Sequence, residues 1–96
     1  MKKAQQKDIE AMYKAVLSLQ STEEARNFFR DLLTETEINE LAERWKAARM
    51  LASGIPYTQI IDQTGLSSTT VARVARWVHK GTGGYRLALK RAGVVK

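Results

Sequence analysis

The chain has 96 residues, and we predict a single helical domain over residues 1–96. Cysteine is absent, which excludes disulfides and thiolate metal sites, and no apolar run approaches the roughly 18 residues that suggest a membrane-spanning helix. The N-terminus lacks the apolar core of a signal peptide, so no membrane partner and a cytoplasmic location are expected.

Charge is divided unevenly along the chain. Residues 1–43 carry six Lys/Arg and nine Asp/Glu, a net charge of −3, whereas residues 44–96 carry ten Lys/Arg and a single acid, Asp62, a net charge of +9. A one-sided basic block attracts polyanions and makes their binding depend on salt. The second half is therefore a candidate nucleic-acid-binding region, although a solvated basic tail would have the same composition.

Three amphipathic helices are predicted over the first half, about residues 5–52. Ser21 and Thr34 each precede a Glu by three residues, the capping-box pattern that begins a helix. Spacings of three and four define the expected inward positions: Ile9, Met12, Tyr13, Val16, Leu17, Ala25, Phe28, Phe29, Leu32, Leu33, Ile38, Leu41, Trp45, Ala48 and Leu51. These apolar stripes are too rich for a thin monomer, so we expect the helices to form a dimer interface.

Two short helices, about 57–64 and 68–79, are predicted to meet at Gly65 and form a helix-turn-helix over about residues 57–78. A tight turn there needs a residue that accepts positive φ, which glycine does without a steric penalty. Ser67 occupies the N-cap position of the second helix. Five apolar residues around the turn are expected to form its core: Ile60, Ile61, Leu66, Val71 and Val74.

The second helix of this motif carries the predicted DNA contacts. A helix fits the major groove, where small polar side chains and Arg reach base edges or phosphates. Phosphate contacts position a protein, and base contacts specify the sequence. We expect a groove-facing set comprising Ser67, Ser68, Thr69, Ala72 and Arg73, with Thr70 beside them, and a phosphate-holding set comprising Thr58, Arg76, Lys80 and Arg86.

A last helix is expected over about residues 85–92, with Leu87 and Ala88 packed against the body of the domain. Trp45 and Trp77 lie at helical core spacing, which favours burial over base stacking. The single histidine, His79, has no cysteine or carboxylate cluster beside it, so no metal site is predicted. No nucleophile–base pair is evident either, so no catalytic residues are predicted.

The sequence resembles a known family at these positions. The stretch from Leu33 to Ile38, together with Leu41, Arg44, Leu51 and the helix-turn-helix, resembles the bacterial Trp repressor (TrpR) superfamily, and Gly83 to Leu89 resembles its TrpR-like YerC/YecD branch. The resemblance covers about residues 10–92. It implies an all-α, six-helix fold and an intertwined homodimer, in which the N-terminal helices, the third helix and the last helix interlock between subunits.

The resemblance also bears on a small effector. In relatives that bind tryptophan as a corepressor, one Thr and two Arg contribute to the pocket, and Thr34, Arg44 and Arg73 occupy the matching positions here. Val74 replaces a glycine and Trp77 replaces a serine, so both side chains would occupy the space of the indole. No cofactor is therefore predicted, and tryptophan or another effector is not favoured.

Plainer interpretations exist for the three pocket residues. Thr34 is expected to be an N-cap, Arg44 to form a salt bridge with Glu40, and Arg73 to contact DNA directly.

The resulting hypothesis is a sequence-specific regulator, in the first instance a repressor, that binds double-stranded DNA as a homodimer. A non-catalytic adaptor that uses the fold for protein contacts is the alternative, and a helical enzyme subunit is a third. The sequence names neither the operator nor the regulated genes.

Overall fold

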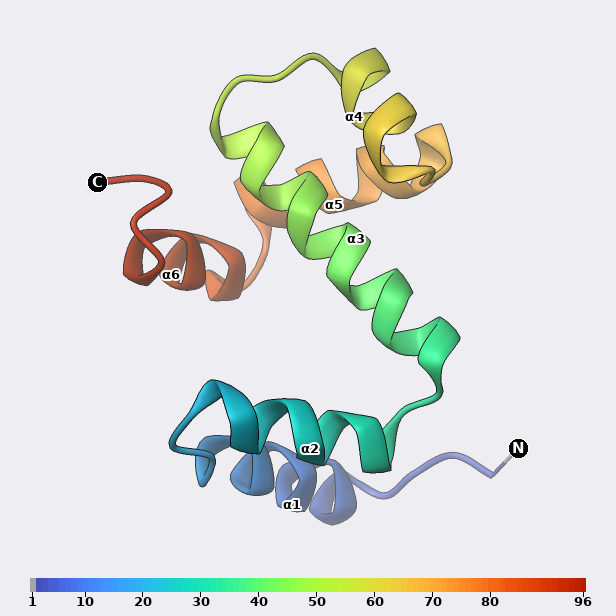
Figure 1. Ribbon diagram of the computed structural model, residues 1–96, viewed down its shortest axis with the longest axis vertical. Helices are drawn as coiled ribbons and strands as arrows, with labels where there is room; N and C mark the ends of the chain where they lie inside the picture. Colours follow the sequence, from blue (N-terminus) through green and yellow to red (C-terminus); the bar gives the residue numbers. More distant parts are fainter. Residues whose placement is uncertain (1) are drawn as a thin grey trace. The chain divides into compact units, whose positions relative to one another are not determined.

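The computed structural model describes residues 2–96, which form six α-helices and, within that range, no strand. The helices are α1 Gln6–Leu17, α2 Thr22–Leu32, α3 Glu35–Ala52, α4 Tyr57–Thr64, α5 Ser68–Lys80 and α6 Gly84–Arg91 (Figure 1). This confirms the predicted all-α, six-helix fold. Among these helices, none is both long and apolar enough to cross a membrane. The chain divides into two compact units, Met1–Ile38 and Asn39–Lys96.

Capping boxes begin two helices, as the sequence predicted. At α2 the Ser21 hydroxyl accepts from the Glu24 amide at 3.1 Å. At α3 the exchange is reciprocal, because the Thr34 hydroxyl accepts from the Glu37 amide at 3.1 Å while the Glu37 carboxylate accepts from the Thr34 amide at 2.9 Å. Hydrogen bonds from the Thr34 backbone, then from its side chain, lower the pKa of Glu37. This cap is thus complete near neutral pH and weakens only as the carboxylate becomes protonated in acid.

The first unit leaves its apolar stripes uncovered. Among residues 2–38 none is buried. Leu17 is 85% exposed and Tyr13 is 56% exposed, while Phe28 and Phe29 meet edge to face with ring centroids 5.7 Å apart. The predicted inward positions of α1 and α2 therefore have no core of their own. Exposed apolar patches of this kind mark interaction surfaces.

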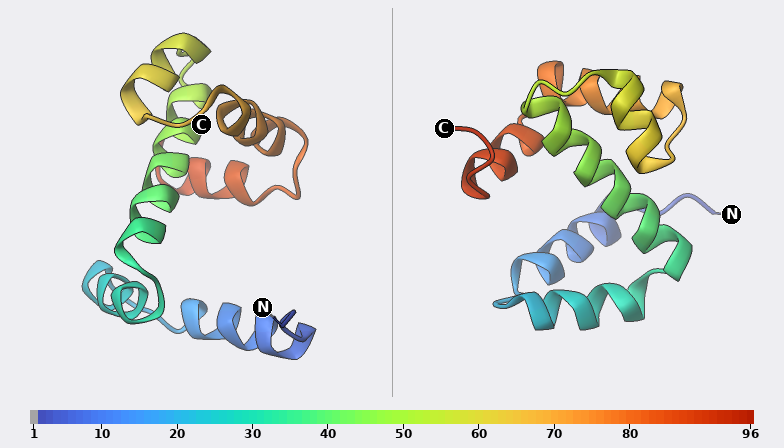
Figure 2. Two further views of the ribbon diagram at one scale, coloured as in Figure 1. Left: turned by 90° about the vertical axis from the view of Figure 1, so that its right-hand side faces the viewer. Right: turned by 45° about the horizontal axis from the view of Figure 1, so that its top comes forward.

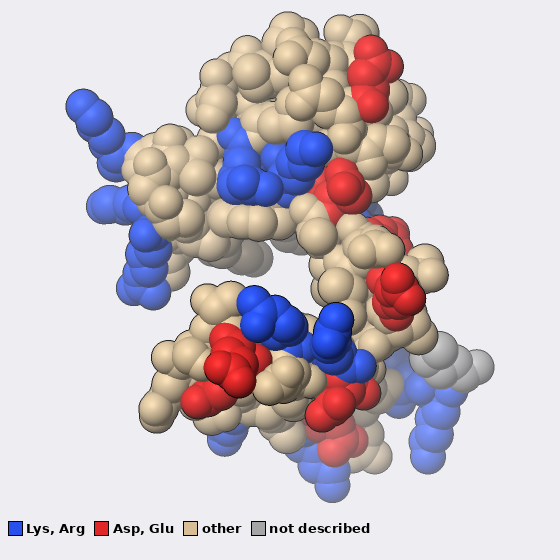
Figure 3. Space-filling view, viewed as in Figure 1, with Lys and Arg blue, Asp and Glu red and all other residues tan. Residues whose placement is uncertain are grey.

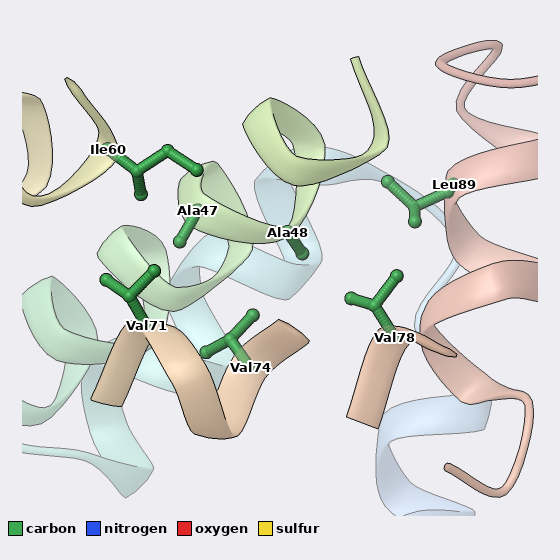
Figure 4. Close-up of a cluster of buried hydrophobic side chains, with 7 residues drawn as sticks. All are labelled: Ala47, Ala48, Ile60, Val71, Val74, Val78 and Leu89. Carbon is green, nitrogen blue, oxygen red and sulfur yellow. The ribbon is translucent and has the colours of Figure 1, made fainter. Parts of the chain in front are cut away.

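The second unit holds the hydrophobic core. Small side chains from α3 meet a row of valines on α5, and α4 and α6 each pack against α5 (Figures 2 and 4). The core side chains are Ala47, Ala48, Ile60, Val71, Val74, Val78 and Leu89. Residues three and four apart on α5 lie on one face, so a single helix can contact all three of its neighbours.

The predicted core is confirmed at the turn, whereas Leu41 on α3 and both Leu87 and Ala88 on α6 were expected inward and are exposed. Ile60, Val71 and Val74 are buried. Leu41, expected inward, is 47% exposed, because the core residues of α3 lie nearly two turns further along it, at Ala47 and Ala48. On α6 the expected Leu87 is 48% exposed and Leu89 is buried instead; two positions are about 200° apart around a helix, so the two leucines point to opposite sides.

Candidate nucleic-acid interface

The turn between α4 and α5 is made by Gly65. Its φ is +71° and its amide donates to the carbonyl of Ile61 at 3.0 Å, which ends α4 with a left-handed cap. A Cβ built at this position would meet nothing within 4 Å. The glycine is therefore needed for its backbone conformation and not for space, as the sequence predicted.

Thr64 fastens the same turn and was not singled out from the sequence. Its buried hydroxyl donates to the Ile60 carbonyl at 2.7 Å and accepts from the Leu66 amide at 3.2 Å. One hydroxyl thus satisfies a helix carbonyl and the first amide beyond Gly65. Lys46 adds a contact from α3, because its Nζ donates to the Gln63 carbonyl at 3.3 Å.

Thr64→Val should lower the free energy of unfolding by ~1–3 kcal/mol, because the isosteric side chain keeps the volume but leaves the partly buried Leu66 amide without its acceptor. Urea denaturation at one fixed protein concentration measures this. Thr58→Val is the matched control, since Thr58 is exposed at the start of α4 and the same substitution there should change stability by less than about 0.5 kcal/mol. Equal midpoints for the two variants would contradict the role given to Thr64.

Two of the four hydroxyls at the start of α5 are used by the helix itself. The Ser67 Oγ accepts from the Thr70 amide at 3.1 Å and bonds the Thr70 hydroxyl at 3.0 Å, which confirms Ser67 as the N-cap. Ser68 and Thr69 are exposed and make no hydrogen bond through their side chains to other described residues. The tip of α5 therefore presents these two hydroxyls outward.

A groove without acidic residues follows the outer face of α5. It brings together five of the predicted DNA-contacting residues and one that was assigned to the core, Trp77. The lining residues are Thr69, Ala72, Arg73, Arg76, Trp77 and Lys80. Around the neighbouring α6, Lys and Arg also predominate, whereas acidic side chains lie along α3 (Figure 3). The groove has the charge and the exposed helix face that a polyanion requires.

Arg86 has an additional structural role. Its Nε donates to the Val78 carbonyl at 3.1 Å, and its Nη2 donates to the His79 carbonyl. These carbonyls belong to the last turn of α5, where a positive charge complements the helix dipole. Arg86 therefore ties α6 to the end of α5, whether or not its remaining N–H groups reach a phosphate.

Of the three residues at the matching effector positions, two have partners within the chain and the third is exposed. Thr34 caps α3 in the first unit, and Arg44 pairs with Glu40 at 2.8 Å, so both plainer interpretations are confirmed. Arg73 is exposed. In the second unit Arg44 and Arg73 border a cavity of about 40 Å³ that is also lined by Thr70, Val74, Trp77 and Tyr85. Small-molecule sites have roughly 300–1,000 Å³, so this cavity by itself holds no amino acid.

The two tryptophans differ in their surroundings. Trp45 is half-buried and lies parallel to Tyr85, with ring centroids 6.4 Å apart and planes 6° apart. Trp77, expected to be buried, is 45% exposed. Helical spacing predicted that Trp77 lies beside the buried valines of α5, but α6 covers only part of the side of α5 that carries Trp77. The basic residues that surround it in sequence, Arg73, Arg76 and Lys80, were the available signal that this position lies at the surface.

The sequence matches the family described as Trp repressor protein over residues 7–93. The chain belongs to the Trp repressor family. Members of this family are regulators rather than enzymes, and their fold supports DNA binding through a helix-turn-helix in general.

Individual relatives place the chain among the TrpR-like members. It is 41% identical over 85 residues to YerC of Bacillus subtilis (strain 168), an uncharacterized protein, and the match covers 88% of this chain and 82% of YerC. The structure resembles a TrpR-like protein from Eubacterium eligens ATCC 27750 with a TM-score of 0.87 and 35% identity, over 96% of this chain and 95% of that one. A candidate Trp repressor from Staphylococcus aureus gives a TM-score of 0.86 and 32% identity, over 96% and 92% of the two chains.

Proposed function

We propose that this Trp repressor family member is a sequence-specific regulator that represses transcription by binding double-stranded DNA as a homodimer. The supporting observation is the acid-free groove along α5, which begins at an exposed hydroxyl tip and carries Arg73, Arg76 and Lys80. A helix with this pattern can enter the major groove while its cations hold the flanking phosphates. The cytoplasmic location expected from the sequence belongs to the same proposal, because the bacterial chromosome lies there.

The contacts divide into two groups along α5. Ser68, Thr69, Ala72 and Arg73 lie in the first half of the helix and are exposed, so they are assigned to base edges. Arg76 and Lys80 follow one and two turns later and are assigned to phosphates. Ser67 and Thr70 act through the cap, in which the Ser67 hydroxyl satisfies the Thr70 amide. The amides that precede it at the start of α5 are assigned to an incoming phosphate. Thr58 is exposed in the first turn of α4 and is assigned to a second phosphate.

A salt titration tests the proposal. Selection of bound fragments from random DNA supplies the duplex, and fluorescence anisotropy measures its affinity between low and high potassium chloride. Each neutralised phosphate contributes about −0.9 to the slope of log Kobs against log salt, so the two phosphate-assigned cations, Arg76 and Lys80, on each of two subunits predict a slope of about −3.6. A slope near zero, or a selection that enriches no sequence, would favour the adaptor function instead.

Dimer formation is proposed from the uncovered face of α1. Met12, Tyr13, Val16 and Leu17 are all exposed on that face, and a 96-residue chain gains much from burying such a surface. A two-fold dimer would present two copies of α5 to a pseudo-palindromic site with half-sites about one helical turn apart.

Leu17→Glu should shift the chain from dimer to monomer at micromolar concentration, because a carboxylate in an apolar interface loses its hydration without gaining a partner. Sedimentation equilibrium measures the change. Ala11→Glu is the matched control: Ala11 is exposed on the opposite side of α1, and the variant adds the same charge. The interface is misplaced if both variants remain dimeric or if both dissociate.

We propose further that DNA binding requires no tryptophan. The cavity that Arg44 and Arg73 both border within the second unit has about 40 Å³, and Val74 and Trp77 form part of its wall. Repeating the salt titration with added tryptophan should leave the affinity unchanged within about twofold. A gain of tenfold or more, about 1.4 kcal/mol, would establish a corepressor.

A further inference from the structure

Trp77 lies at the junction of two hollows in the surface of the second unit. It borders the cationic groove on α5, between Arg73 and Lys80, and it also borders an aromatic hollow with Trp45 and Tyr85. Its position on α5 is four residues after Arg73 and three before Lys80, so the three side chains follow one face of the helix. Trp77 is 45% exposed, which places a large apolar surface among the cations of the groove.

The end of α5 leaves room for the Trp77 ring because the residue that follows the helix is a glycine. Gly81 donates its amide to the Trp77 carbonyl at 3.0 Å. A Cβ built on Gly81 would lie 2.9 Å from Cε3 of the Trp77 ring and 2.3 Å from the Trp77 carbonyl oxygen. Only glycine therefore fits at this position while the ring lies against the helix end. A tryptophan side chain has only two rotatable bonds, so it loses little conformational entropy when a ligand covers it.

We propose that Trp77 packs its exposed ring against a deoxyribose of the bound DNA, between the phosphates held by Arg76 and by Lys80. The inference rests on the DNA-binding function proposed above and adds an apolar contact to it. Stacking in a duplex covers the faces of the bases, whereas the sugars at the rim of the major groove present apolar C–H groups. The surrounding cations select a polyanionic partner, which favours a sugar–phosphate backbone over an apolar peptide.

An apolar contact has a signature that separates it from the cationic ones. Salt screens charge–charge attraction but leaves apolar burial almost unchanged. Trp77→Leu should therefore weaken DNA binding by about tenfold at every potassium chloride concentration and leave the salt slope unaltered. Lys80→Ala is the comparison, because losing one phosphate contact on each subunit should reduce the slope by about 2. Trp77→Phe should restore part of the affinity.

A fluorescence experiment tests the same contact with the ring in place. The chain contains two tryptophans, so in Trp45→Phe the emission comes from Trp77 alone. Acrylamide should quench this emission in the free protein, and the selected duplex should protect it by threefold or more, in proportion to the bound fraction measured by anisotropy.

Each other outcome overturns the inference in a recognisable way. Full binding without protection of Trp77 would show that the ring faces away from the DNA. Protection that is already complete in the free protein would show that a second copy covers it. A Trp77→Leu effect that grows or shrinks with salt would show that the residue acts through its charged neighbours. If no duplex binds at any salt concentration, the proposed function itself fails, and the adaptor alternative takes its place.

Discussion

Arg73→Ala is expected to weaken binding to the selected operator by ~1–3 kcal/mol, the cost of losing one Arg contact to a base edge. Arg73 is exposed in the α5 groove, and within residues 2–96 the one ion pair joins Arg44 to Glu40, so no carboxylate holds Arg73 in the free protein. Its guanidinium is therefore available for a bidentate contact, and removing it should cost far more affinity for the operator than for unrelated DNA.

Two further variants decide what Arg73 contacts. Arg73→Lys keeps the charge but removes the planar fork, so it should stay weak on the operator if Arg73 reads a base, and recover if Arg73 holds a phosphate. Arg26→Ala removes the same side chain from α2 in the first unit, where Arg26 is exposed, and should leave the operator affinity within about twofold. Unchanged operator affinity in Arg73→Ala would remove α5 from the DNA-reading role.

Ile60→Ala is expected to lower the free energy of unfolding by ~2–5 kcal/mol, which is a large part of the total for a small domain. Ile60 is fully buried and is the one side chain that α4 contributes to the hydrophobic core beneath the valine row of α5. Truncating it leaves a cavity where α3, α4 and α5 meet. Because the same contacts set the angle of the reading helix, DNA affinity should fall as well under conditions where the variant is still folded.

Ile61→Ala is the matched control for the packing argument. Ile61 is the next residue on α4 and is only partly buried against the core, so the same truncation should cost less than half as much. Urea denaturation at one fixed protein concentration compares the two, since the stability of an oligomer depends on concentration. Equal losses would show that the core is not centred on Ile60.

Helix starts and turns could be predicted from the sequence, because they depend on residues that are close together in the chain. The capping pairs Ser21–Glu24 and Thr34–Glu37 act over three residues, so their helix starts were predictable. The left-handed turn at Gly65 is another such feature. The exposed hydroxyl tip of α5 follows from the cap at Ser67, which fixes where the helix begins. The helical repeat then places the cations of the groove along one face.

Features that depend on a distant neighbour were not predictable. Thr64 is a local exception, because its hydroxyl bonds residues only four and two positions away, on both sides of Gly65, and was nevertheless not predicted. Arg86 looked like a free cation, and only the packing of α6 brings it to the α5 carbonyls. Which of the two leucines on α6 is buried depends on the rotation of that helix against α5, which no local pattern encodes.

The sequence by itself determined the six helices, the glycine turn, the divided charge and the family, because helix periodicity, caps and composition are carried by residues a few positions apart. Only the tertiary structure decided that Trp77 is exposed among cations and that Leu89, not Leu87, is buried. Those outcomes depend on which flank of α5 its neighbours cover, and side-chain burial is fixed by packing between segments that are distant in the chain.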